Sequence, residues 1–434
     1  MKEDFISYIW QHQHLDHAVL RTTNGEPLQI LRPGFLNTNA GPDFLEARIE
    51  IGGILWVGNV ELHVKTSEWN SHGHATDPAY ENVVLHVVWI NDLSADEYPN
   101  DRLPLLELKN FVTPGLVTQY HSFQEGFRDI PCENQFEEVQ EIEKATMLEK
   151  LLIERLHQKS NAVLGLLEEN KGDWEETTWQ LVARYFGARI NADPFQKLAQ
   201  RLPIRLLLKH RDNLLQLEAL LFGTAGLIPN EKSCSYVNDL RNEFKFLSHK
   251  YQFGNNSLRP LEWKLLRLRP AGFPTVRMAQ LAALIHRNGN LFSTLTHFHS
   301  THDLYKALRS IQSPYWHTHY HFGKPAESLV PLMGTDAINL LIINAAVPLL
   351  AAFAHKTDQS VFLDKAVSVL EELPVENNKI IRKWKALGLR LNSAANSQGA
   401  TQWYHRFCVP KLCLQCTVGN AIIRKSAIGS FKLE

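Results

Sequence analysis

Apolar and polar side chains alternate with a period of two from Met1 to about Asn110, and this alternation predicts β-strands. The alternating apolar positions are Leu28 and Ile30, Ala47, Ile49 and Ile51, Leu55 and Val57, and Leu62 and Val64. The Gly52-Gly53 pair suits a two-residue hairpin turn. Further strands are expected over 82–90 and 103–108, and a short amphipathic helix over 5–10 precedes them all.

From about Phe136 onward, apolar residues recur with the period of an α-helix. Helices are expected over 174–186, 194–202, 211–222, 233–250, 276–286, 304–311, 338–353, 359–373 and 378–389. Proline and glycine clusters, such as the run from Arg269 to Pro274, separate them. The pattern predicts an α+β protein in which an N-terminal mixed sheet is followed by a long, mainly α-helical region.

The chain has 434 residues, which is more than one hydrophobic core usually serves. We expect an α/β domain over residues 1–130, followed over residues 131–434 by one or more mainly α-helical domains with a cysteine-rich C-terminal segment. Hydrophobic residues make up 44% of the chain and charged residues 21%, which is the composition of a globular protein.

The 45 basic and 46 acidic residues nearly cancel, so no overall field draws the molecule to nucleic acid. Binding to nucleic acid would need a local basic patch. The helical region offers Arg201, Arg205, Lys209, His210, Arg211, Lys264, Arg267, Arg269 and Arg277. These residues equally suit an ordinary solvated surface. Nothing in the sequence indicates an oligomeric state.

The N-terminus lacks the basic start and uninterrupted apolar run of a signal peptide. The most apolar stretch, Ala337 to Ala354, contains Asn339, Asn344 and Pro348, and it predicts a buried helix better than a membrane span. Five cysteines, an odd number, argue against a secreted disulfide framework. We therefore expect a cytoplasmic protein without a membrane partner.

One predicted strand carries three ionisable side chains on a single face, because Glu61, His63 and Lys65 are spaced two residues apart. Asp43 opens the preceding strand, and antiparallel pairing through the glycine turn would return Glu61 beside it. The alternative is a strand with an ordinary solvated polar face.

Two convergent carboxylates, Asp43 and Glu61, would suit a hard divalent cation such as magnesium or manganese. Such an ion activates water and neutralises charge on a phosphate, while Lys65 would stabilise the transition state. We expect the side chain of Lys65 to matter more for cleavage than that of His63. This is the chemistry of phosphodiester hydrolysis.

The loop after this strand is rich in groups that bind metal or phosphate, chiefly His72 and His74 on either side of Gly73. Each histidine is a candidate metal ligand, general acid or phosphate donor, and the alternative is a hydrogen-bonded structural loop. His86 on the following predicted strand is a candidate for the same sheet face as Glu61, although a buried core histidine is the favoured interpretation.

Three cysteines crowd together near the C-terminus, at Cys408, Cys413 and Cys416. Their spacing permits closure on one metal, with His405 or the distant Cys132 as a fourth ligand of zinc or of an iron–sulfur cluster. Zinc is slightly favoured over the cluster. The alternative is a set of free buried thiols.

The run Gly41-Pro42-Asp43, followed by the residues from Glu61 to Lys65, resembles the PD-(D/E)XK nuclease pattern. The resemblance implies a restriction-endonuclease-like core of a helix, three strands, a helix and a strand, with Asp43 and Glu61 as metal ligands. One departure is clear: the position of the pattern's lysine holds His63, and Lys65 comes two residues later.

More of the chain resembles a bacterial domain-of-unknown-function family, number 2851, which implies no activity. The matching runs are Pro33-Gly34, 41–44, 60–63, Trp69, 72–74, 77–80, 82–88, 269–274 and the C-terminal cysteines.

The leading hypothesis is a metal-dependent nuclease that hydrolyses phosphodiester bonds in DNA or RNA. A second is a catalytically degenerate protein that binds nucleic acid or serves as a scaffold. A third is a metal-dependent hydrolase of another phosphorylated substrate, using His72 and His74 on the metal.

Overall fold

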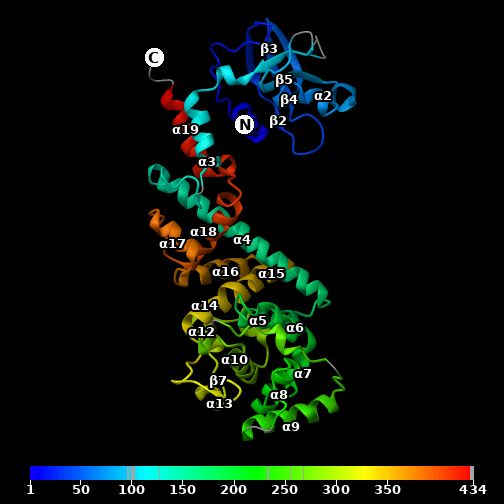
Figure 1. Ribbon diagram of the computed structural model, residues 1–434, viewed down its shortest axis with the longest axis vertical. Coiled ribbons are helices and arrows are strands. Elements are labelled where there is room, and N and C mark those ends of the chain that lie inside the picture. Colours follow the sequence, from blue (N-terminus) through cyan, green and yellow to red (C-terminus); the bar gives the residue numbers. More distant parts are fainter. Residues whose placement is uncertain are drawn as a thin grey trace. The chain divides into compact units, whose positions relative to one another are not determined.

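The computed structural model describes residues 1–94, 97–98, 103–126, 128–231, 234–254, 256–266 and 268–430. Within these ranges the chain forms two compact units (Figure 1). Unit 1 comprises Met1–Met147, Ala386–Leu389 and Trp403–Glu434, and unit 2 comprises Leu148–Lys385 and Arg390–Gln402. Ser233 and Arg267, which fall in expected helical and basic stretches, lie outside the described residues.

A mixed sheet forms the centre of unit 1, in the order β1-β3-β4-β5-β6, with β2 paired to β3. Its strands are β1 (Leu28–Arg32), β2 (Phe35–Leu36), β3 (Phe44–Ile51), β4 (Ile54–Lys65), β5 (Val83–Ile90) and β6 (Leu105–Glu107). Strands β1, β3 and β4 are antiparallel neighbours, whereas β5 runs parallel to β4 and β6 parallel to β5. The alternation of the first hundred residues is therefore confirmed as a mixed sheet.

The β3–β4 hairpin turns through Gly52 and Gly53, both at positive φ, as the glycine pair predicted. The register shifts between Phe44 and Ala47, and Glu46 within this irregularity has a φ of 59°. Phe44 pairs with Val60. An antiparallel ladder with this register places the residue before Phe44 opposite the residue after Val60.

A short crossover joins β4 to β5 and covers one face of the sheet. It consists of α2 (Glu68–Ser71) and two 3₁₀ turns, η1 (His74–Thr76) and η2 (Pro78–Tyr80). Glu68 fastens this crossover to β4, because its carboxylate accepts hydrogen bonds from the backbone N–H groups of Val64 and Lys65 at 2.8 and 3.0 Å. The connection is thus much shorter than a full crossover helix.

Helices α1 (Glu3–His12) and α3 (Pro114–Gln124) pack on the other face of the sheet. The ring of Phe5 stacks on Tyr120 at 4.1 Å and lies 6.0 Å from Trp89 of β5. Trp89 and His86 are an odd number of residues apart on one strand, so they project to opposite faces. Both faces of the sheet are therefore covered, one by helices and the other by the crossover.

The C-terminal segment returns to unit 1. Helix α19 (Thr417–Ser430) packs beside α3, where Figure 1 shows the red and cyan helices side by side. The side chains of Val418 and Ile423 are fully buried there. The observed division differs from the expected boundary at residue 130, because these distant residues complete the apolar interior of the N-terminal unit.

Unit 2 is mainly helical, as the sequence period predicted. Its helices are the greater part of α4 (Glu141–Glu169), α5 (Trp174–Phe186), α6 (Ala192–Arg201), α7 (Ile204–Leu208), α8 (Leu214–Thr224), α9 (Ser235–Lys250), α10 (Pro274–Arg287), α11 (Leu291–Thr296), α12 (Thr301–Leu308), α13 (Tyr315–Thr318), α14 (Thr335–Leu341), α15 (Val347–Thr357), α16 (Ser360–Glu372), α17 (Lys379–Ala386) and α18 (Ala394–Trp403). A small hairpin, β7 (His319–His321) and β8 (Lys324–Pro325), was not expected.

The most apolar helical stretch of the described chain, Thr335–Thr357, is long and apolar enough to cross a membrane, but 72% of its most apolar window is buried inside the structure. A π-helical segment, Ile342–Ala346, interrupts it just before Pro348. The proline has no N–H to donate, and Lys159 donates instead to the carbonyl oxygen of Ile343 at 3.4 Å and to Oδ1 of Asn344 at 2.9 Å. The stretch has the features of a core helix.

Candidate functional site

Asp43 and Glu61 lie opposite each other at the start of the β3–β4 pairing. The backbone N–H of Asp43 donates to Oε2 of Glu61 at 3.1 Å, and the backbone N–H of Leu62 donates to Oδ2 of Asp43 at 3.0 Å. Each carboxylate therefore accepts a backbone hydrogen bond from the strand that carries the other. The register shift in β3 brings the two acids together as the sequence predicted.

Three histidines gather next to this pair, and we call His63, His72 and His74 the histidine cluster. One ligand nitrogen from each lies within 4.8 Å of the other two. Among the described residues, this is the set of histidine, cysteine, aspartate and glutamate side chains that meets this distance. Gly73, at a φ of 78°, reverses the chain between His72 and His74, and this backbone conformation favours glycine.

Glu61 is the carboxylate that adjoins the histidine cluster. Its Oε1 lies 3.2 Å from Nε2 of His74 and 3.6 Å from Nε2 of His63. The Nε2 atom of His74 is buried, and among the described residues it has no hydrogen-bond partner of acceptable geometry. Three imidazoles and one carboxylate thus converge, with one buried nitrogen left over to bind something else.

A chain of hydrogen bonds runs from the cluster into the sheet. Nδ1 of His63 lies 2.9 Å from Nε2 of His86, and Nδ1 of His86 lies 3.1 Å from the hydroxyl of Tyr98. If Nδ1 of each histidine carries the proton, both bonds are satisfied and Nε2 of His63 keeps its lone pair for the cluster. Such outer partners fix the ring and tautomer of a metal-ligating histidine. His86 is therefore buried in the core and also orients the ring of His63.

Nε2 of His63 also lies 3.1 Å from Nδ1 of His72, so the two rings share a proton when no cation lies between them. Aromatic side chains wall the rest of the cluster. Tyr80 stacks on His74 at 3.8 Å, and Trp69 packs edge-on to His74 at 5.5 Å. His63 is buried but His72 is exposed. The cluster therefore has a rigid inner side and one side open to solvent.

Burial and neighbouring charges shift the pKa values of these groups. Burial, and next the charge of Asp43, raises the pKa of Glu61 to about 8. Burial lowers the pKa of His63 to about 3, and it also lowers the pKa values of His74 and His86. His63, His74 and His86 are thus neutral at pH 7, as metal-ligating histidines must be.

The donor set fits a divalent transition-metal ion better than the expected magnesium. Imidazole nitrogens suit zinc, iron, copper and nickel, whereas magnesium prefers oxygen ligands and retains its waters. His63, His72, His74 and Glu61 would hold such an ion. Asp43 would stand behind Glu61, with one of its oxygens already engaged by the backbone of Leu62.

Lys65 lies outside this constellation. Its side chain is exposed at the end of β4. The pKa of Asp92 is lowered mainly by hydrogen bonds from Ser67 and to a smaller extent by the charge of Lys65. Two-residue spacing places Lys65 on the predicted strand face. Lys65 is nevertheless four residues after Glu61, so their backbones are roughly 13 Å apart along the strand. The cluster contains the imidazole of His63 where the sequence pattern suggested an ammonium group.

Three further residues of the site were not identified from the sequence. Tyr98 ends the hydrogen-bond chain, Glu68 anchors the crossover, and Glu3 opens α1 near the acids. Burial, followed by the charges of Asp43 and Glu68, raises the pKa of Glu3. No spacing rule connects these residues to the histidines, because the fold alone brings three separate segments together.

The C-terminal cysteines and Cys132 are all in unit 1 and buried, whereas His405 is exposed. No disulfide joins any of the five cysteines. The described basic residues that were considered for nucleic-acid binding belong to unit 2, and Arg277 among them is half-buried, with a pKa lowered by burial.

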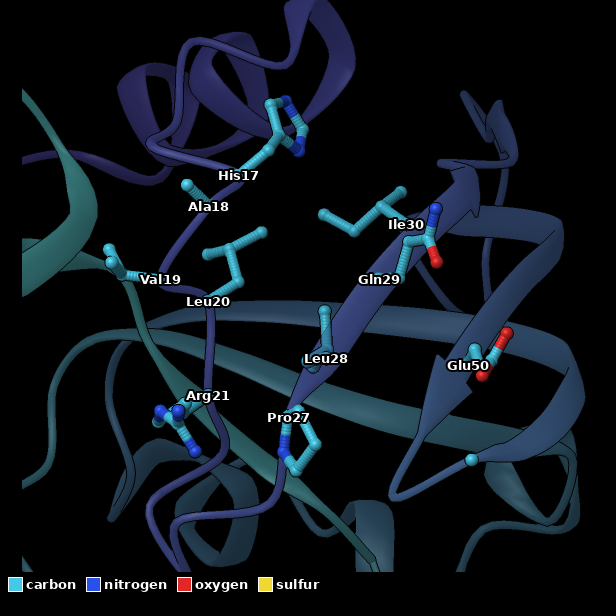
Figure 2. Close-up of a pocket in the computed structure, with 11 residues that line it drawn as sticks. His17, Ala18, Val19, Leu20, Arg21, Pro27, Leu28, Gln29, Ile30 and Glu50 are labelled. Carbon is cyan, nitrogen blue, oxygen red and sulfur yellow. The ribbon is translucent and has the colours of Figure 1, made fainter.

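The hollow in Figure 2 does not contain the candidate site. It has a volume of about 420 Å³ and lies between the loop from His17 to Arg21 and strand β1. The side chains of Leu20 and Ile30 face its interior, and none of the histidine cluster lines it. The chemistry of unit 1 is therefore concentrated at the crossover and not at this hollow.

Comparison with known proteins gives one match. The profile of a family described as "Protein of unknown function (DUF2851)" matches residues 3–379. No curated protein and no solved structure matches the chain.

Proposed function

The chain belongs to the DUF2851 family, whose description assigns no activity, and we propose from the site alone that it is a metal-dependent hydrolase of phosphodiester bonds. The observation that carries the proposal is the histidine cluster, whose three ligand nitrogens lie within 4.8 Å of one another beside the carboxylate of Glu61.

The protonation states support a cation at this place. Burial without a compensating positive charge raises the pKa of Glu61 to about 8, and a divalent ion that displaced its proton would supply that charge, while the neutral rings of His63 and His74 can bind an ion without first losing a proton. Nε2 of His74 makes no hydrogen bond to any described residue and lies 3.2 Å from Oε1 of Glu61, so both atoms could contact the same ion. An ion held there would polarise a phosphoryl oxygen and activate a water molecule.

The order of elements supports phosphodiester chemistry. Helix α1, strands β1, β3 and β4, the short α2 and strand β5 follow the order of the nuclease core that the Asp43 and Glu61 motif resembles, with β4 and β5 parallel. The fold-level analogy favours DNA or RNA as the substrate. The histidine cluster is a departure from that pattern. Because Lys65 lies at the exposed end of the strand, the bound ion instead of a lysine would stabilise the negative charge of the transition state.

The residues of this chain would divide the work as follows. His63, His72 and His74 hold the ion, and Glu61 neutralises part of its charge. Asp43 holds the backbone of β4 in place through Leu62. The exposed side of His72 leaves room for a phosphate to approach.

The test is metal binding and cleavage by the full-length chain. Elemental analysis and calorimetric titration with zinc, manganese and magnesium measure binding. Cleavage is followed on single-stranded DNA, duplex DNA, RNA and the small diester bis(p-nitrophenyl) phosphate. We expect zinc or manganese to bind and to support cleavage, and Glu61→Gln to weaken both.

His121→Ala is the matched control, because His121 is a histidine of unit 1 on α3 that pairs with Glu125 away from the cluster. It should bind metal and cleave as the unmodified chain does. Binding of metal and nucleic acid without cleavage would support the degenerate alternative. Cleavage of phosphomonoesters only would support a hydrolase of another phosphorylated substrate.

A further inference from the structure

Two segments that are far apart in sequence lie side by side in unit 1. The side-chain amide of Gln124 donates to the carbonyl oxygen of Lys411 at 3.3 Å, across a separation of 287 residues. The ammonium group of Lys411 donates to the carbonyl oxygen of Gly126 at 3.0 Å. The rings of Phe136 and Trp403 lie 6.0 Å apart. The segment after α3 and the C-terminal segment therefore face each other along their length.

Four cysteines meet where these segments face each other. Cys132 is contributed by the first segment, and Cys408, Cys413 and Cys416 by the second; the four are between 5% and 7% exposed. Burial raises the pKa of Cys132, and the neighbouring Cys416 and Cys413 raise it further. Burial and then the same neighbours, with Cys132, raise the pKa of Cys408. Each thiol is thus within electrostatic reach of the others.

Lys411 acts electrostatically on one of these thiols through its ammonium group. Its charge lowers the pKa of Cys413, although burial and Cys416 together raise that pKa to about 12. Its ammonium group is held by carbonyl oxygens of the first segment, which fixes it beside the thiols. A site for four negative sulfurs would need such a counter-charge.

We propose that these four thiols bind one iron–sulfur cluster. Tetrahedral zinc, with bonds of about 2.3 Å, would bring its sulfurs to within about 3.8 Å of one another. No three of the four cysteine sulfurs, all of them described, lie within 4.8 Å of one another. The proposed cluster is of the [4Fe–4S] type, which binds each of its four cysteines through a different iron and so accepts more widely spaced sulfurs. His405 is exposed and takes no part.

The cluster fastens the C-terminal segment to the segment after α3. A covalent link between residues so distant in sequence removes much of the freedom of the unfolded chain, so it stabilises the folded unit. The contacts of Lys411, Phe136 and Trp403 bring the thiols together before the cluster forms. This role is independent of the hydrolase site, because none of the four cysteines belongs to the histidine cluster.

The experiment is to purify the full-length chain without oxygen and to measure iron and acid-labile sulfide per chain. We expect about four of each per chain for a [4Fe–4S] cluster. Electron paramagnetic resonance of the reduced protein should show a cluster signal. The sulfide measurement distinguishes the cluster from iron bound at the histidine cluster, which would bring no sulfide.

Cys132→Ser and Cys413→Ser should lose the sulfide and most of the iron. Cys234→Ser is the matched control, because Cys234 is exposed and lies in unit 2. One zinc ion per chain without sulfide would overturn the proposal, and so would the absence of sulfide after reconstitution of the unmodified chain with ferrous iron and sulfide. The measurement on the unmodified chain decides the matter even if the serine variants do not fold.

Discussion

His63 is the residue at which the sequence pattern and the structure lead to opposite expectations. The nuclease pattern has a lysine at this position, and Lys65 was expected to take its role. In the structure, the ring of His63 lies 3.1 Å from His72 and 2.9 Å from His86, whereas Lys65 is exposed. We therefore reverse the earlier ranking of these two side chains.

His63→Ala should reduce the affinity for zinc or manganese by about 100-fold or more, because it removes a ligand, and Lys65→Ala should change it by less than about twofold. Both affinities are measured by calorimetric titration of the full-length chain at pH 7. Circular dichroism checks that His63→Ala keeps its secondary structure. Loss of metal binding in Lys65→Ala with normal binding in His63→Ala would show that Lys65, and not His63, belongs to the metal site.

Glu218 on α8 allows a test of residue-scale electrostatics in unit 2. Burial raises its pKa to about 7, and the side chain is 1% exposed, with Oε2 accepting a hydrogen bond from Tyr236 at 2.9 Å. The folded state thus holds its proton more tightly than the unfolded state, whose pKa is near 4.5. Stability from this group is present below pH 4.5 and is lost as the pH rises through 7.

Glu218→Gln should therefore raise the melting temperature at pH 8 but change it little at pH 4.5. At pH 8 the free energy of unfolding should rise by on the order of 1 to 3 kcal/mol, because the neutral amide can still accept the hydrogen bond from Tyr236. Thermal unfolding at the two pH values measures it. Glu371→Gln, on an exposed position of α16, serves as the control. An equal gain at both pH values would show that ionisation is not the cause.

At the scale of elements, the crossover from β4 to β5 is what builds the site. It is short, and Gly73 makes the reversal that brings His72 and His74 into the histidine cluster. Gly73→Ala would place a side chain at a φ of 78°, which costs about 1 kcal/mol, although an added Cβ would meet no atom within 4 Å. The strain would be relieved by moving the two histidines.

We expect Gly73→Ala to weaken metal binding by about tenfold while lowering the melting temperature only slightly. Gly165→Ala is the contrasting variant, because Gly165 is exposed within α4 with open space around it. It should stabilise the protein by about 0.5 to 1 kcal/mol and leave metal binding unchanged. Calorimetric titration and thermal unfolding test both variants. Unchanged binding in Gly73→Ala would show that the loop does not position the ligands.

At the scale of the whole molecule, the C-terminus determines the integrity of the N-terminal unit. Ile423 of α19 is fully buried in unit 1. Ile423→Ala should destabilise that unit by about 2 to 5 kcal/mol, because it leaves a cavity. Hydrogen–deuterium exchange should then show faster exchange in β4 and β5, with little change in α8 and α10 of unit 2.

Ile153→Ala is the control, because Ile153 of α4 is 52% exposed and its loss leaves no buried cavity. The opposite exchange pattern, with faster exchange confined to unit 2, would show that α19 belongs to the helical domain, as the sequence alone predicted.

The sequence by itself determined the elements of this protein and the pairing of two acids. Two-residue alternation gave the sheet and the helical period gave the helices, because each period reflects which side of one local element is buried. The Gly52-Gly53 turn set the register of the hairpin as far as Ala47, and the register shift between Phe44 and Ala47 then placed Asp43 beside Glu61. Both are consequences of residues that are near in sequence.

Only the tertiary structure decided which distant groups meet. His63 and His86 become neighbours through parallel pairing across the crossover, and Tyr98 joins them from beyond β5. Likewise, Cys132 reaches the C-terminal cysteines because α19 packs beside α3. No local period records such contacts, since they depend on how separate elements bury their apolar faces against one another.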